Sequence, residues 1–347
     1  GADLTGVAQL TDAAEARATG EVGHAVLRRL GELPVPSFAF VNGAAMGGGL
    51  EVALHCTYRT LSTGAGLLAL PEVFLGLIPG WGGAYLLPRL VGAQKALKVI
   101  IENPLSQNRM LKPADVMKLG IADVALEPAD FLTQSLRWAA DVVRGTVVVE
   151  RPDVTSDAEA WDAAVAGARA LVDAKLHGAT PAPYRALDLV AAARTATRDE
   201  GFAAEDDALT DLVMGDELRS GLYSFDLVQR RAKRPVGAPD KGLARPITKV
   251  GVVGAGLMAS QLALLFVQRL EVPIVLTDLD QARVDKGVAW VHGEIAKLQE
   301  KGRLNQDKAN RLSALVSGST SKADFADASV VIEAVFEDLK VKQQVFA

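Results

Sequence analysis

The spacing of apolar and polar positions changes twice along the chain. Up to about residue 130, short apolar runs such as residues 37–41 alternate with glycine clusters, which is typical of strands followed by helices. From there to residue 229 the apolar residues recur at helical spacing, most clearly in residues 163–176 and 209–229. An apolar run, a glycine turn and a second apolar run return after residue 248. The pattern predicts an α/β chain with a mainly helical middle.

Residues 230–246 interrupt these patterns with three prolines and two glycines, which mark connections between domains. We therefore predict a first domain over residues 1–200, a connector helix and linker over residues 201–246, and the first part of a second domain over residues 247–347. The chain begins without a methionine and ends in an apolar pattern. We expect both ends to be cuts through folded elements.

Composition narrows the classes of protein. Of the 347 residues 49% are hydrophobic and 23% are charged, which is an ordinary globular balance. The net charge of −5 gives no basic surface for nucleic acid, and the basic linker lacks interleaved aromatic residues. No apolar run approaches the ~20 residues of a membrane helix, and nothing resembles a signal peptide. We expect no nucleic-acid partner and no integral membrane segment.

Cysteine and histidine usage bears on compartment and metals. Cys56 is the only cysteine, which favours a reducing compartment, and we expect a cytoplasmic location. The four histidines lie far apart in the sequence without the spacing of metal ligands, so we predict no metal site.

One candidate site combines a glycine triplet with two glutamates. A predicted strand runs into residues 47–49 and then into a helix that carries Glu51 in its first turn. Free backbone N–H groups at such a helix start favour developing negative charge, as on the oxygen of a thioester enolate. Glu72 follows in a largely apolar stretch. A glutamate pair in a desolvated pocket can activate water and protonate carbon.

These segments resemble the enoyl-CoA hydratase/isomerase (crotonase) superfamily. The resemblance covers about residues 1–130 and rests on Gly-Ala-Asp-Leu at the start, Val-Asn-Gly-Ala-Ala-Met-Gly-Gly-Gly-Leu-Glu up to Glu51, and Leu-Pro-Glu-Val…Gly-Leu-Ile-Pro-Gly-Trp-Gly-Gly around Glu72. It implies a spiral ββα fold whose N-terminal strands are missing here. It also implies that the backbone N–H groups of Ala2 and Gly48 form the oxyanion hole and that both glutamates are catalytic. His55, on the same helix, is expected only to pack.

A second candidate site is a dinucleotide fingerprint in its required context. A short strand over residues 249–253 leads into Gly254, Gly256 and Ala259, then a helix, then a second strand that ends at Asp278. The first glycine makes the tight turn, and the second lets a pyrophosphate approach the helix start. Because an acid at the end of the second strand repels a 2′-phosphate, we expect NAD rather than NADP.

The segment Ser-Val-Val-Ile-Glu-Ala-Val-Phe-Glu-Asp-Leu-Lys-Val-Lys, residues 329–342, resembles the 3-hydroxyacyl-CoA dehydrogenase family. The resemblance covers about residues 247–347 and implies a Rossmann-type doubly wound NAD-binding domain. It implies NAD contacts from Ala334, Glu337 and Lys342, and we count Leu257 and Met258 at the helix start with them. The catalytic histidine of that family is expected beyond residue 347.

Together the two parts resemble the multifunctional α subunits of bacterial fatty acid β-oxidation complexes. This resemblance implies hydration of trans-2-enoyl-CoA to 3-hydroxyacyl-CoA, followed by NAD-dependent oxidation to 3-ketoacyl-CoA. It also implies an acyl-CoA thioester substrate and a thiolase β subunit as partner. Two alternatives stay open: a Δ3–Δ2-enoyl-CoA isomerase or peroxisome-type bifunctional protein, and a non-catalytic module that binds acyl-CoA and NAD.

Overall fold

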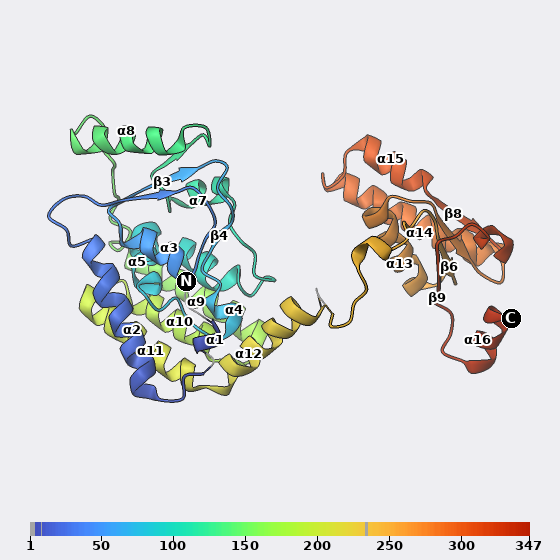
Figure 1. The fold of residues 1–347 in the computed structure, drawn as a ribbon, viewed down its shortest axis with the longest axis horizontal. Helices are drawn as coiled ribbons and strands as arrows, with labels where there is room; N and C mark the ends of the chain where they lie inside the picture. Colours follow the sequence, from blue (N-terminus) through green and yellow to red (C-terminus); the bar gives the residue numbers. More distant parts are fainter. Residues whose placement is uncertain (1–3, 8, 233–234) are drawn as a thin grey trace. The chain divides into compact units, whose positions relative to one another are not determined.

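The computed structural model describes residues 4–7, 9–232 and 235–347. The chain divides into two compact units, Gly1–Val236 and Gly237–Ala347, which are described separately (Figure 1). In the described part of the chain no helix is both long and apolar enough to cross a membrane.

The first unit contains two small sheets in which all strand pairs are parallel. One sheet has the order β1-β3-β5 and the other pairs β2 with β4. The strands are β1 (Phe38–Val41), β2 (Ala45–Met46), β3 (Tyr58–Ser62), β4 (Leu68–Ala69) and β5 (Val124–Leu126).

Helices make up most of the first unit and enclose one continuous apolar core. They are α1 (Leu4–Val7), α2 (Ala13–Leu27), α3 (Gly48–His55), α4 (Glu72–Leu75), α5 (Gly83–Val91), α6 (Ala93–Leu97), α7 (Pro113–Leu119), α8 (Phe131–Val143), α9 (Ala158–Leu176), α10 (Ala182–Ala192), α11 (Arg198–Met214) and α12 (Asp216–Asp226). A 3₁₀ turn at Arg28–Leu30 and π-helical turns at Lys98–Glu102 and Leu227–Ala232 complete the helical set.

The long helices α2 and α11 lie side by side at one flank of this unit (Figure 1). Two glycines of α2 make the close approach possible. A Cβ at Gly20 would collide with the Asp206 carboxylate, and a Cβ at Gly23 would collide with the Trp81 indole. The glycines therefore let a carboxylate and an aromatic ring reach the surface of α2.

Residues 209–229, which the pattern predicts to be helical, form the end of α11, all of α12 and the start of the following π-helical turn, with a break between the two helices. Gly215 adopts extended backbone, with φ −75° and ψ 152°, and serves both as the end of α11 and as the start of α12. Apolar spacing alone did not reveal the break, since Leu212 and Leu218 on its two sides are both buried. The predicted linker begins within the π-helical turn Leu227–Ala232 and includes a 3₁₀ turn at Lys241–Leu243.

The second unit is built on a four-stranded parallel sheet of order β8-β7-β6-β9, which has the first strand in the interior. Its strands are β6 (Val250–Val253), β7 (Ile274–Thr277), β8 (Val316–Ser319) and β9 (Val330–Glu333). Its helices are α13 (Leu257–Leu270), α14 (Gln281–Glu300), α15 (Gln306–Ala314) and α16 (Leu339–Phe346), with a 3₁₀ turn at Lys322–Phe325. This order is that of a doubly wound nucleotide-binding sheet.

The parallel sheets of both units confirm the predicted α/β fold class. The boundaries at residues 200 and 246 remain predictions. The first unit of the structure includes α11, which packs along α2 and so is part of the unit that holds the glutamate pair.

Candidate active site

The two-stranded sheet of the first unit places both predicted glutamates at one edge. Strands β2 and β4 run parallel, with Ala45 opposite Leu68 and Met46 opposite Ala69. Helix α3, which carries Glu51, begins shortly after β2, and α4 begins at Glu72 shortly after β4. Because parallel strands end at the same edge, the sequence positions 51 and 72 meet in space.

Gly47 shapes the junction between β2 and α3. Its N–H donates to the Ala69 carbonyl at 3.0 Å, which ties the end of β2 to β4. Its backbone has φ +54° and ψ −129°, a conformation that favours glycine. A Cβ at this position would lie 2.6 Å from Glu72 Oε1, so the missing side chain makes room for that carboxyl group against the start of α3.

Glu51 is buried, and backbone hydrogen bonds fix the position of its carboxylate. Its side chain lies in the first turn of α3 with the residue only 3% exposed. Glu51 Oε1 accepts hydrogen bonds from the backbone N–H groups of Trp81 (2.8 Å) and Gly83 (3.0 Å). Burial and the nearby Glu205 carboxylate raise the pKa of Glu51 to about 7, and the two backbone donors oppose that rise.

Glu72 differs from Glu51 in its partners. Its Oε2 atom is buried and has no hydrogen-bond partner among the described residues. Burial, and next the negative charge of Glu51, raise the pKa of Glu72 well above its usual value. The geometry therefore favours a neutral acid at Glu72 beside an ionisable carboxylate at Glu51 that two N–H groups stabilise.

The predicted oxyanion hole is described only in part. Gly48 is the first residue of α3, where a backbone N–H has no partner within the helix and carries the positive end of the helix dipole. Ala2 lies outside the described residues. The roles of Gly48 and Ala2 stay predictions.

The sequence predicted that His55 only packs, but in the structure it also forms a hydrogen bond. It is buried at the end of α3, and its Nε2 lies 2.9 Å from the Trp81 carbonyl oxygen. Because a carbonyl can only accept, Nε2 carries the proton. Burial lowers the pKa of His55 to about 4, so the ring is neutral and donates one hydrogen bond to the turn that holds Glu51.

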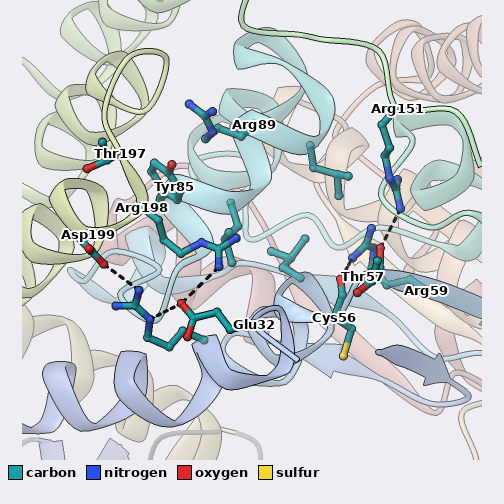
Figure 2. Close-up of a pocket in the computed structure, with 14 residues that line it drawn as sticks. Glu32, Cys56, Thr57, Arg59, Tyr85, Arg89, Arg151, Thr197, Arg198 and Asp199 are labelled. Atoms are coloured by element: carbon teal, nitrogen blue, oxygen red, sulfur yellow. Dashed lines mark hydrogen bonds and ion pairs between the residues drawn. The ribbon is translucent and has the colours of Figure 1, made fainter. Parts of the chain in front are cut away.

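A cavity of about 580 Å³ lies at the other end of α3 and is a poor candidate for catalysis (Figure 2). It is rich in arginine, but these side chains already have partners: four pair with carboxylates, and Arg89 donates to the backbone carbonyls of Ala193 and Arg194. Arg28 contacts Asp199 and Glu32, and Arg198 contacts Glu32 as well. Neither Glu51 nor Glu72 lines this cavity.

The glycine turn of the second unit has the geometry of a pyrophosphate site. Gly254 has φ +109°, and its N–H donates to the Thr277 carbonyl at 2.6 Å. A Cβ there would lie 2.7 Å from the Ala334 carbonyl oxygen. At Gly256, the residue before α13, a Cβ would find no atom of the described residues within 4 Å. A ligand can therefore approach the backbone at the start of α13.

Asp278 closes the same turn from the end of β7. Its Oδ2 accepts from the Ala255 N–H at 2.9 Å, and its Oδ1 accepts from the Leu279 N–H at 2.7 Å. Arg283 contacts both Asp278 and Asp280, so it is already paired with two carboxylates. This arrangement agrees with a site for the diol of NAD rather than for a 2′-phosphate.

The other predicted NAD contacts surround this turn. The Ala334 N–H donates to the Val253 carbonyl at 2.8 Å, which places Ala334 beside the turn. Leu257 and Met258 lie in the first turn of α13 with exposed side chains. Lys342 forms ion pairs with Glu337 and Glu333, at 2.8 and 3.1 Å. Glu337 and Lys342 thus have partners in each other, and their NAD contacts stay predictions.

Two family models match the chain. Residues 1–155 match enoyl-CoA hydratase/isomerase, and residues 249–347 match the NAD binding domain of 3-hydroxyacyl-CoA dehydrogenase. Each match covers the region in which the sequence showed the corresponding motif.

Single curated relatives align with most of this chain, across both regions that the family models match. The peroxisomal fatty acid beta-oxidation multifunctional protein MFP2 of Arabidopsis thaliana is 33% identical over 320 residues, which cover 90% of this chain and 42% of the relative. The fatty acid oxidation complex subunit alpha of Shewanella halifaxensis is 30% identical over 352 residues, which cover 99% of this chain and 48% of the relative. The chain thus spans less than half the length of either relative.

Among solved structures, (S)-3-hydroxybutyryl-CoA dehydrogenase PaaH1 from Ralstonia eutropha is 33% identical. The match covers 29% of this chain and 35% of that chain, with a TM-score of 0.28.

Proposed function

We propose that this chain, which joins a domain of the enoyl-CoA hydratase/isomerase family to a 3-hydroxyacyl-CoA dehydrogenase NAD-binding domain, acts in fatty acid β-oxidation. Its first unit would hydrate trans-2-enoyl-CoA to 3-hydroxyacyl-CoA. Its second unit would supply the NAD-binding part of the oxidation to 3-ketoacyl-CoA. The observation that carries the proposal is the pair formed by the buried Glu51 and the half-buried Glu72, whose pKa values are both raised, at the start of α3.

In hydration a hydroxyl oxygen bonds to the β-carbon and a proton bonds to the α-carbon. Glu51, ionised and held by two backbone N–H groups, takes the proton of the attacking water. Glu72, in its neutral form and with an oxygen that has no partner in the described part of the chain, gives its proton to the α-carbon. Gly48 N–H would stabilise the negative charge that develops on the thioester oxygen. The pair then returns to its starting state by passing one proton from Glu51 to Glu72 through solvent.

The second unit fits a dinucleotide. The backbone of Gly254 and Gly256 and the N-terminus of α13 would hold the pyrophosphate, and Asp278 stands at the end of β7, where the ribose hydroxyls would lie. When bound, NAD accepts the hydride released from the hydroxyl-bearing carbon.

The pH dependence of hydration follows from the two raised pKa values. At a pH below the first ionisation of the pair both glutamates are protonated, and neither can accept a proton from water. At a pH above the second ionisation both are ionised, and neither can donate a proton to the α-carbon. We therefore expect a bell-shaped profile of kcat/KM whose acid limb lies near pH 7, where Glu51 titrates. The measurement is the rate of crotonyl-CoA hydration from acid to alkaline pH. An acid limb at the pH of an ordinary exposed glutamate would contradict the burial argument.

The choice between hydratase and isomerase is tested with two substrates. The full-length protein is given a trans-2-enoyl-CoA and, separately, a 3-enoyl-CoA of the same chain length. The proposal expects 3-hydroxyacyl-CoA from the first. Double-bond migration from the second, with no hydration of the first, would instead identify an isomerase. Binding of both thioesters without turnover of either would identify a non-catalytic module.

We also propose a thiolase β subunit as partner and a cytoplasmic location. The first is supported by a relative that is named as subunit alpha of a fatty acid oxidation complex. The second is supported by the buried free thiol of Cys56, which suits a reducing compartment.

A further inference from the structure

The turn that holds Glu51 is itself held by a second buried carboxylate. The N–H groups of Trp81 and Gly83 donate to Glu51 Oε1. The N–H of the residue between them, Gly82, donates to Glu205 Oε2 at 2.6 Å. Glu205 Oε1 accepts a further hydrogen bond from the Tyr85 N–H at 2.7 Å. Successive N–H groups of one turn thus serve two carboxylates.

Glu205 comes from α11 and is fully buried, with 0% exposure. Its Oε2 lies 3.0 Å from His24 Nε2, and Asp206 Oδ1 lies 2.9 Å from His24 Nδ1. The His24 ring also stacks on Phe202, with centroids 4.3 Å apart. Although burial lowers the pKa of His24, hydrogen bonds and charges from the two carboxylates raise it on balance to about 9. At neutral pH both ring nitrogens therefore donate.

We propose that Glu205, held by His24 and Asp206, is a positioning residue that fixes the Trp81–Gly83 turn and through it the carboxylate of Glu51. The proposal deepens the hydration function proposed above and rests on it. Neither the family matches nor the sequence motifs identify these three residues.

The turn has little freedom to adjust by other means. Gly82 has φ +99°, and a Cβ there would lie 2.7 Å from His55 Nε2. A Cβ at Gly83 would lie 2.8 Å from Glu51 Oε1. The backbone of the turn is therefore in close contact with the side chains of His55 and Glu51. Its position is set by the carboxylates that accept its hydrogen bonds. A shift of about 1 Å in a catalytic group can cost 10²-fold in rate.

Glu205 and His24 also act on the pKa of Glu51 through their charges. The groups whose charge reaches Glu51 are Glu72 of α4, Glu205 of α11 and His24 of α2. The Glu205 charge raises the pKa of Glu51, and the His24 charge lowers it. His24 in turn faces Glu205 and Asp206, and its charge is felt by His55 of α3. Removing either member of the His24–Glu205 pair should therefore move the pH profile, and in opposite directions.

The test compares three variants of the full-length protein in crotonyl-CoA hydration. Glu205→Gln removes the carboxylate with little change in shape. We expect kcat to fall by about 10–100-fold with KM changed less than about twofold, because the groups that bind the thioester are untouched. The acid limb should move to lower pH, because the Glu205 charge that raises the pKa of Glu51 is gone while His24 keeps its charge through Asp206.

His24→Gln leaves the bonds from Glu205 to the turn and removes the positive charge that lowers the pKa of Glu51, so its acid limb should move to higher pH. The matched control is Asp207→Asn on the same helix, an exposed side chain that pairs with Arg17. It should match wild-type rates and wild-type pH dependence.

Folded Glu205→Gln and His24→Gln variants with wild-type kcat and unmoved limbs would overturn the proposal. Should Glu205→Gln fail to fold, the shift of the pH profile in His24→Gln tests the proposal by itself.

If the wild-type protein hydrates nothing, the proposed function fails, and the fluorescence of Trp81 tests the positioning role instead. Its emission is isolated from the other three tryptophans by subtracting the spectra of matched Trp81→Phe proteins. It should shift in Glu205→Gln but not in Asp207→Asn, and an unshifted spectrum would overturn the proposal.

Discussion

Replacement of Glu72 by glutamine is expected to lower the hydration rate by about 10²–10⁴-fold, the contribution of one positioned acid or base. The physical reason is the state of this carboxyl group. Its buried Oε2 has no hydrogen-bond partner among the described residues, and burial and Glu51 raise its pKa well above its usual value, which favours the protonated form. Glutamine has nearly the same shape but cannot release that proton to the α-carbon.

The variant should still bind the thioester, because Gly48 and the walls of the site are unchanged. Steady-state hydration of crotonyl-CoA gives the rate, and binding of a non-reactive acyl-CoA gives the affinity. A matched control is Glu159→Gln, an exposed glutamate in the first turn of α9, which should keep the wild-type rate. An unchanged rate in Glu72→Gln would refute the role assigned to Glu72.

Replacement of Gly254 by valine is expected to weaken NAD binding by about 10–100-fold. Gly254 has φ +109°, and a Cβ would lie 2.7 Å from the Ala334 carbonyl oxygen. Strain of this kind costs about 1–3 kcal/mol, and each 1.4 kcal/mol corresponds to about tenfold in affinity. To relieve the contact, the turn must move away from β9, which displaces the N–H groups at the start of α13.

Titration with NADH followed by its fluorescence measures the effect. Gly293→Ala is the matched control: the position is an exposed site on α14, and a Cβ there meets no atom of the described residues within 4 Å. Crotonyl-CoA hydration should be unchanged in both variants, since Glu51 and Glu72 belong to the other compact unit. Wild-type affinity for NADH in Gly254→Val would show that this turn is not part of the binding site.

Motifs made of neighbouring residues could be predicted from the sequence. The glycine triplet with Glu51, and the strand, turn and helix around Gly254, each depend on contacts within one short segment. The meeting of Glu51 with Glu72 followed from the family resemblance, and the parallel pairing of β2 with β4 gives its physical basis.

Contacts between distant segments could not be predicted. His24 and Glu205 are separated by 181 positions, and nothing in either segment indicates that α2 and α11 lie together. The stripe of Gly20, Gly23 and His24 on α2 is a signal in retrospect, because two small residues beside a histidine allow close packing. The break at Gly215 was missed for a related reason, since a glycine inside an apolar helical pattern does not say whether the helix continues.

We propose above that one chain joins a glutamate-pair hydratase to an NAD-dependent oxidation. One sequential absorbance assay tests this proposal. The full-length protein is mixed with crotonyl-CoA, the loss of the conjugated-thioester absorbance is followed, and NAD is then added. We expect the absorbance to fall before NAD is present and NADH to form afterwards. No loss of absorbance from a folded protein would contradict the roles of Glu51 and Glu72, and hydration without NADH would contradict the role of the second unit.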